Sequence, residues 1–117
     1  MPLIQLDTSF SFPDANRKQA VAKMLSQIAA EASGKPEQYV MACIQDNAAM
    51  AMSGSAGPCA LVTVKAIGGL SKSVNQTFAA KVSQLLQKEL NIPANRVYLT
   101  FEELAPTNWA WDGRTFG

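Results

Sequence analysis

The chain has 117 residues, of which 48% are apolar and 16% charged, and its formal net charge is +1. This size favours one domain, residues 1–117, with a single hydrophobic core. The small net charge argues against nucleic acid as a partner, because phosphate binding needs a basic surface. No apolar run approaches the roughly 18 residues of a membrane span, and no signal peptide is visible. We therefore expect a cytoplasmic protein with no membrane partner, and any release from the cell would take a leaderless route.

The residue types limit the chemistry. The chain has no histidine, which excludes nucleophile pairs and metal sites that depend on imidazole. Its two cysteines, Cys43 and Cys59, make no disulfide framework, and we expect Cys43 to be a small core residue. A base would have to be a carboxylate, a lysine, a tyrosine, a cysteine or the terminal amine.

The first predicted strand begins directly after the start methionine. The alternating run LIQLDT, residues 3–8, follows Pro2, and proline is tolerated at the first position of a strand. If Met1 is removed after synthesis, the nitrogen of Pro2 is no longer an amide. It becomes a secondary amine, which is a base on a rigid ring.

A helix and a second strand complete the first half. Asp14 is a candidate N-cap and Gly34 suits the left-handed position after a helix. Between them, one helical face is apolar: Val21, Met24, Leu25, Ile28 and Ala29. The run YVMACIQ, residues 39–45, then predicts a strand that follows the turn at Pro36.

The second half repeats this plan at an offset of 57 residues. The strand ALVTVKAI, residues 60–67, precedes a helix that ends at Asn91, and the strand RVYLTFEE, residues 96–103, follows. The helix carries its own apolar face: Val74, Phe78, Val82, Leu85 and Leu86. Each half, about 2–57 and 58–117, is therefore a β-α-β unit with parallel strands. Together they predict an α+β fold, a four-stranded sheet with two helices on one face.

The other face of this sheet has no element to cover it. The runs ALVTV and YVMACI are apolar on both sides of the pleat, as is usual for strands that are covered on both sides. We expect other copies of the chain to cover this face, which makes the protein a homo-oligomer.

Six segments together resemble one family. MPLIQLDT, GKPEQYV, AMSGSAGPCAL, IGGLSKSVNQTFAAKVSQLLQKEL, NRVYLTFEEL and NWAWDGRTF are similar, in order, to segments of the macrophage migration inhibitory factor and D-dopachrome tautomerase family. The resemblance covers essentially the whole chain. It implies the tautomerase fold, a homotrimer with active sites between neighbouring subunits, and keto–enol tautomerisation of phenylpyruvate or dopachrome without a cofactor.

The resemblance also assigns roles to residues. Pro2 matches the catalytic base of the family. Its substrate-contacting residues match Lys35, Tyr39, Ile67, Tyr98, Trp111 and Phe116. Three positions depart from the mammalian cytokine: Thr100 replaces an asparagine, Trp109 replaces a small aliphatic residue at the pocket rim, and Val62 replaces the second cysteine of its redox motif. Thr100 and Trp109 are therefore further candidate pocket residues, and an oxidoreductase activity should not transfer.

The expected mechanism depends on the state of the terminal amine. Burial beside Lys35 and Ile67 would lower the pKa of the Pro2 amine toward neutrality, where a general base works best. Lys35 would pair with the carboxylate of an aromatic α-keto acid substrate. One alternative is a cytokine-like binding or signalling protein with a vestigial pocket and a protein receptor. Another, ranked last, is a hydratase-like dehalogenase or decarboxylase, which would need pocket arginines that the chain does not clearly provide.

Overall fold

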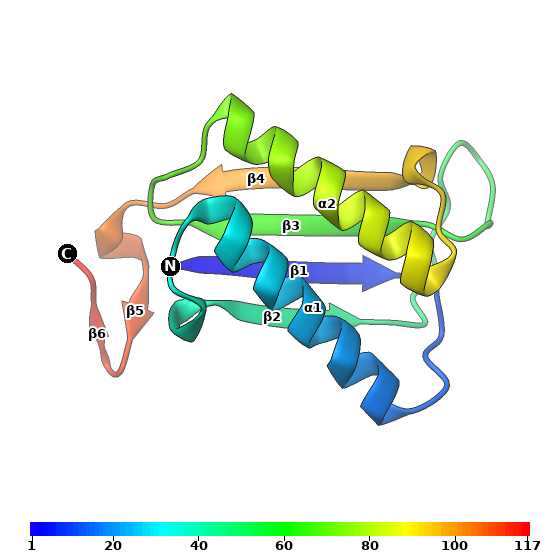
Figure 1. Ribbon diagram of the computed structural model, residues 1–117, viewed down its shortest axis with the longest axis horizontal. Helices are drawn as coiled ribbons and strands as arrows, with labels where there is room; N and C mark the ends of the chain where they lie inside the picture. The colour runs from blue at the N-terminus through cyan, green and yellow to red at the C-terminus, as the bar shows by residue number, and fades with distance from the viewer.

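Four strands form one mixed sheet, and both helices lie on the same side of it. The computed structural model describes residues 1–117, and Figure 1 shows helices α1 and α2 in front of the sheet. The main elements are β1 Pro2–Thr8, α1 Ala15–Ser33, β2 Met41–Gln45, β3 Ala60–Ala66, α2 Lys72–Leu90 and β4 Val97–Glu103. The short ones are the 3₁₀ turns η1 Glu37–Tyr39, η2 Ala94–Arg96 and η3 Pro106–Asn108, and the strands β5 Ala110–Trp111 and β6 Arg114–Thr115.

The sheet has the strand order β2-β1-β3-β4. Strands within a half are parallel, β1 with β2 and β3 with β4. The two halves meet through the antiparallel pair β1 and β3, in which Pro2 lies opposite Ala66 and Thr8 opposite Ala60. These pairings confirm the expected α+β fold with two β-α-β repeats and both helices on one face. They also place the starts of β1 and β2 at the opposite end of the sheet from the starts of β3 and β4.

The start of α1 and the ends of both helices are those that the sequence predicts. The side chain of Asp14 accepts a hydrogen bond of 2.7 Å from the backbone N–H of Arg17, which satisfies a free donor of the first turn. After α1, Gly34 takes the left-handed conformation with φ +71°, and after α2 Asn91 takes it with φ +55°. Neither helix combines the length and the apolar character that a membrane crossing would require.

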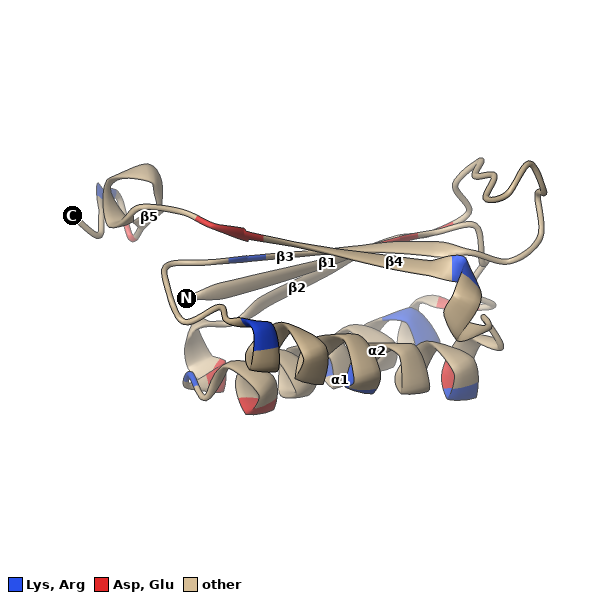
Figure 2. Cartoon of the chain, turned by 90° about the horizontal axis from the view of Figure 1, so that it is seen from above, with Lys and Arg blue, Asp and Glu red and all other residues tan.

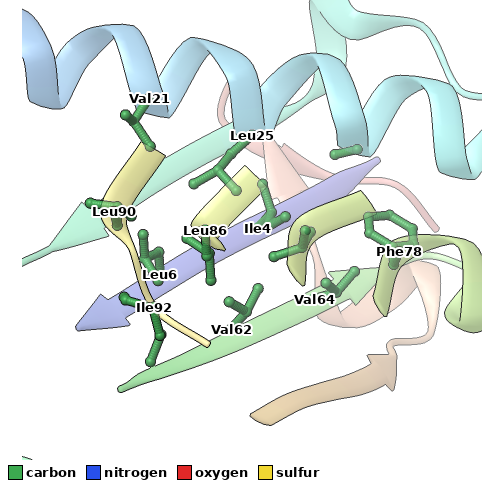
Figure 3. Close-up of a cluster of buried hydrophobic side chains, with 13 residues drawn as sticks. Ile4, Leu6, Val21, Leu25, Val62, Val64, Phe78, Leu86, Leu90 and Ile92 are labelled. Atoms are coloured by element: carbon green, nitrogen blue, oxygen red, sulfur yellow. The ribbon is translucent and has the colours of Figure 1, made fainter. Parts of the chain in front are cut away.

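The core lies between the helices and the two central strands (Figure 3). Leu25 of α1 and Phe78 of α2 are fully buried against the sheet residues Ile4 and Val64. The complete cluster consists of Ile4, Leu6, Val21, Leu25, Ala29, Ala60, Val62, Val64, Phe78, Val82, Leu86, Leu90 and Ile92. Val62, which belongs to this cluster, is fully buried.

The face of the sheet away from the helices carries no element of the chain (Figure 2). Its side chains follow from the alternation along each strand: Leu3, Gln5, Asp7, Met41, Cys43, Gln45, Leu61, Thr63, Lys65, Tyr98, Thr100 and Glu102. The expectation that this face is apolar is therefore wrong, because most of these residues are polar. Met41 and Tyr98 are nevertheless each 66% exposed, so large apolar groups remain uncovered in the single chain. Assembly into an oligomer stays a prediction.

Two further expectations are corrected. Cys43 is only half-buried and lies on the open face, whereas Cys59 is the buried cysteine. Tyr39 does not begin a strand, because the residues after Pro36 form the 3₁₀ turn η1, closed by a hydrogen bond of 2.9 Å from the N–H of Val40 to the carbonyl of Glu37. The second half has the same turn after Pro93, so both repeats enter their last strand through it.

Candidate active site

A cavity of about 290 Å³ opens at the end of the sheet where β1 begins. Three segments contribute to it: the start of β1, the junction between η1 and β2, and the C-terminal hairpin. The lining residues are Met1, Pro2, Leu3, Gln38, Tyr39, Val40, Met41, Trp109, Ala110, Trp111 and Phe116. The walls are mainly apolar and aromatic, which is typical of a pocket for a small organic ligand.

The strand pairing explains why the first two segments meet. Because β1 and β2 are parallel, both begin at the same edge of the sheet, and Leu3 lies opposite Met41. The η1 turn directly precedes β2 and therefore delivers Tyr39 to the same place. Residues far apart in the sequence thus surround the amino terminus.

The third segment is a short hairpin. Strands β5 and β6 are joined by Asp112 and Gly113, whose φ angles are +53° and +81°. Two successive residues with left-handed backbones form a tight turn whose twist matches the twist of the two strands that it joins. The N–H of Phe116 then donates a hydrogen bond of 3.1 Å to the carbonyl of Trp109. Figure 1 shows this hairpin beside the amino terminus, at the same end of the sheet.

Tyr39 and Trp111 form an aromatic wall that joins two of these segments. Their ring centroids lie 6.1 Å apart with an interplanar angle of 89°, an edge-to-face contact. Such pairs contribute about 0.5–1.5 kcal/mol beyond the area that they bury. Trp111 is nevertheless 59% exposed, so this wall lies at the open side of the cavity.

Lys35 lies beside the terminal amine. It follows Gly34 at the end of α1, and its Nζ donates hydrogen bonds of 2.8 Å to the carbonyl of Ile67 and 3.1 Å to that of Gly68. Burial first, and then the charge of Lys35 and a hydrogen bond from it, lower the pKa of the terminal amine of Met1 from 8.0 to about 6. The amine is therefore largely unprotonated at neutral pH.

The turn at Gly68 and Gly69 holds this lysine in place. Both glycines have left-handed backbones, with φ +68° and +81°. A Cβ on Gly69 would lie 3.2 Å from Cε of Lys35, so the glycine leaves room for the side chain. The carbonyl oxygens of this turn face the ammonium of Lys35, whereas in an anion-binding loop backbone N–H groups face the ligand. Ile67 contributes its carbonyl to Lys35, and neither residue is among those that line the cavity.

Tyr98 and Thr100 lie outside this cavity. Both are on the open face of β4, and Tyr98 pairs in register with Leu61, which in turn pairs with Asp7 near the far end of β1 from Pro2. Tyr98 instead lines a separate hollow of about 190 Å³ beside residues 50–52 and 59–61.

No arginine lines the cavity. Arg17 pairs with Glu89 at 3.1 Å, and Arg114 lies in β6. Arg96 donates hydrogen bonds to four backbone carbonyls, those of Met52, Ser55, Gly57 and Pro58. Carboxylate binding by an arginine therefore has no support at this cavity.

The sequence reasoning missed several lining residues: Leu3, Gln38, Val40, Met41 and Ala110. The parallel pairing of β1 and β2 was a usable signal for Leu3 and Met41, because it brings the first residues of both strands together. The Asp-Gly dipeptide at 112–113 was a signal for the hairpin, since this pair strongly favours two-residue hairpin turns.

Comparisons with known proteins agree with this architecture. The family model described as macrophage migration inhibitory factor (MIF) matches residues 1–117. The chain is 38% identical to the MIF homolog of Brugia malayi over 117 residues, which is the full length of both, and 31% identical to MIF of Rattus norvegicus over 116 residues, 99% of each.

Solved structures show the same fold. The structure of MIF from Toxoplasma gondii superimposes with a TM-score of 0.90 at 33% identity, covering 97% of this chain and 99% of that one. The MIF homologue from Prochlorococcus marinus gives a TM-score of 0.90 at 37% identity, covering 98% and 99%. The α+β fold with two helices against a four-stranded mixed sheet is therefore the tautomerase fold, and the chain belongs to the macrophage migration inhibitory factor family.

Proposed function

We propose that the protein is a cofactor-independent keto–enol tautomerase for aromatic α-keto acids such as phenylpyruvate, with Pro2 as the general base once Met1 is removed. The observation that best supports this function is the terminal amine of lowered pKa, which lies beside Lys35 at an aromatic-lined cavity. An amine of lowered pKa is an unprotonated base at neutral pH and needs neither histidine nor a metal ion. The family membership of the chain is consistent with this chemistry.

The pKa of about 6 belongs to the amine of Met1, and removal of that residue leaves the amine on Pro2. The Pro2 residue is fully buried and lines the same cavity. The same two causes, burial and the positive charge of Lys35, therefore act on its nitrogen. A secondary amine starts from a somewhat higher pKa than a primary one, and both causes bring it down toward neutrality.

In the proposed reaction, the lone pair of the Pro2 nitrogen takes a proton from the carbon between the aromatic ring and the keto group. The electrons of the broken C–H bond form a C=C bond, and the carbonyl π electrons move to oxygen. The protonated proline then returns its proton to that oxygen, which gives the enol and restores the base. The reaction releases no group and consumes no oxidant or reductant.

The other residues bind and orient the substrate. The ammonium of Lys35, held by two backbone carbonyls, pairs with the substrate carboxylate as a point charge. Tyr39, Trp111 and Phe116 contact the ring and exclude water from the reacting carbon. In the homotrimer, Tyr98 and Thr100 of one subunit reach the cavity of the next. Their distance from Pro2 along the sheet supports a site shared between copies.

The test is an assay of phenylpyruvate tautomerisation, followed by the ultraviolet absorbance of the enol, on protein whose intact mass shows that Met1 is absent. We expect Pro2→Ala to lower turnover at least about 100-fold, the smallest contribution typical of a positioned base. The matched control is Pro13→Ala, which changes an exposed proline before α1 and should leave turnover unchanged. Undiminished turnover in Pro2→Ala, or no turnover in a wild-type protein with a free Pro2, would refute the proposed function.

A further inference from the structure

Arg96 binds the loop of residues 52–58 through four hydrogen bonds from its guanidinium. The acceptors are backbone carbonyls: that of Pro58 at 2.8 Å from Nε, that of Met52 at 3.2 Å from Nη1, and those of Ser55 and Gly57, both at 3.0 Å from Nη2. A guanidinium presents five N–H donors in one rigid plane, whereas the ammonium of a lysine has three donors around one nitrogen. This set of bonds therefore requires an arginine.

No other hydrogen bond joins the loop 52–58 to the rest of the chain. The N–H and carbonyl groups of Met52 and Ser55 bond to one another at 2.9 and 3.0 Å, and the N–H of Gly57 donates to the hydroxyl of Ser55 at 3.2 Å. These bonds shape the loop internally and do not attach it to the domain. Figure 1 shows the loop between β2 and β3, at the end of the sheet opposite the amino terminus. Arg96 therefore provides the hydrogen bonds that fix where the loop lies.

The loop continues into one wall of the hollow that Tyr98 lines. This hollow of about 190 Å³ is bounded by residues 50–52, residues 59–61 and Tyr98. The backbone of Tyr98 is held in the sheet opposite Leu61, but its side chain is on the open face and 66% exposed. Residues 50–52 belong to no helix or named strand, so their place beside the ring depends on how the loop is held.

We propose that Arg96 is a positioning residue of the shared site: it fixes the loop 52–58 against the start of β4, and the loop holds the ring of Tyr98 toward the cavity of the neighbouring subunit. This inference rests on the proposed function, in which Tyr98 completes the site of the next subunit. Arg96 directly precedes β4, whose first residue lies in register with the end of β1 far from Pro2. Its loss should therefore impair the neighbour's site and leave its own subunit's base intact.

The first measurement is kcat/KM for phenylpyruvate in Arg96→Met, Tyr98→Phe and the double variant. We expect each single variant to lose about tenfold, as for the loss of one hydrogen bond to the substrate. The double variant should lose no more than the larger single loss, because both changes act through the same hydroxyl. Losses that multiply, or an unchanged Arg96→Met, would overturn the inference. The matched control is Arg17→Met, which removes an arginine that donates to Glu89 at 2.7 and 3.1 Å and should keep the wild-type value.

Mixed trimers show which subunit Arg96 serves. Chains with Pro2→Ala and chains with Arg96→Met are expressed together, and Lys23→Glu, an exposed change, marks one of them so that ion exchange isolates the mixed species. In a cyclic trimer with sites between neighbours, every mixed trimer has one site with an intact Pro2 from one chain and an intact Arg96 from the next. We therefore expect about one third of the wild-type kcat/KM. A value below about one tenth, or the absence of mixed trimers, would contradict a role in the neighbour's site.

A readout without turnover separates this inference from the proposed function. The chain has two tyrosines, Tyr39 and Tyr98, so protein labelled with 3-fluorotyrosine gives two ¹⁹F signals, which Tyr39→Phe assigns. Arg96→Met should shift or broaden the signal of Tyr98 and leave that of Tyr39 unchanged. If phenylpyruvate is not turned over but this selective change occurs, the proposed function fails and the role of Arg96 in placing Tyr98 stands. An identical Tyr98 signal in both proteins overturns the inference. If circular dichroism shows that Arg96→Met is unfolded, Arg96→Lys provides the same comparisons with smaller expected changes in the same direction.

Discussion

Replacement of Lys35 by methionine tests the electrostatic basis of the site. Lys35→Met removes the ammonium and keeps an unbranched chain of similar length. In the structure, burial is the largest cause of the lowered pKa of the terminal amine, and Lys35 contributes through its charge and its hydrogen bond. The pKa of the terminal amine should therefore rise in Lys35→Met and remain below that of an exposed amine, because the burial persists.

The effect on the basic form has a defined upper limit. At pH 7, an amine with a pKa of 6 is about nine-tenths unprotonated, whereas one with a pKa of 8 is only about one-tenth unprotonated. This tenfold limit applies to the primary amine of Met1; the secondary amine of Pro2 starts from a higher pKa, and Lys35→Met should lose active base at pH 7 and recover it as the pH rises. Any further loss of kcat/KM that persists at pH 9 reflects the missing contact with the substrate carboxylate.

The assay is the pH dependence of kcat/KM for phenylpyruvate from pH 5 to 9, which reports the pKa of the free enzyme's base. A titration of ¹³C-labelled proline by NMR gives the same midpoint without substrate. Lys23→Met, which removes an exposed lysine of α1, should superimpose on the wild-type curve. A midpoint in Lys35→Met that equals the wild-type value, or one that moves to lower pH, would show that the reasoning about Lys35 is wrong.

Three more predictions concern the support of the site and the core. Gly69→Ala should displace Lys35 and lower turnover, because the new Cβ would lie 3.2 Å from Cε; Gly54→Ala, with a similar φ of +71° and open space, should leave turnover unchanged. Arg96→Met loses four hydrogen bonds to carbonyls of residues 52–58, so its free energy of unfolding in urea should be lower by about 2 kcal/mol and hydrogen exchange in that loop should be faster. Equal exchange in the two proteins would contradict the role of Arg96 in holding this loop. Phe78→Ala should cost about 3–5 kcal/mol of unfolding free energy, since the ring is fully buried, and a loss below 1 kcal/mol would be inconsistent with its place in the core.

Local signals predicted most of the fold. Capping residues such as Asp14 and Asn91 mark the helix ends because their chemistry acts within one turn. The apolar residues of each helix recur with the helical period, so they all lie on one face, and this face must pack against the core. The doubling at 57 residues then restricted the topology, because right-handed crossovers make the strands of each half parallel.

The open face of the sheet was harder to predict because, in a short and mostly apolar run, the alternation between apolar and polar residues is difficult to recognise. Thr63 and Lys65 interrupt the apolar letters of β3 at every second position, and Gln5 and Asp7 do the same in β1. Counting letters within a run averages over the two faces, whereas the pleat separates them. The polar face became evident only when the register of all four strands was known.

The site was predictable only in part. The parallel-strand rule brings Pro2 and Lys35 to one edge of the sheet, so their proximity follows from the order of elements. The placement of Trp109 at the same cavity as Leu3 depends on how the last residues of the chain fold back onto the sheet, which a local turn signal such as Asp112-Gly113 does not specify.

The residues that shape the cavity are different from those that stabilise the domain. None of the aromatic walls Tyr39, Trp109, Trp111 and Phe116 belongs to the buried cluster between helices and sheet. Libraries randomised at these four codons should consequently yield mostly well-folded proteins, so the scaffold is suited to directed evolution. In natural lineages, the same separation would let ligand preference diverge quickly while thermal tolerance stays constant.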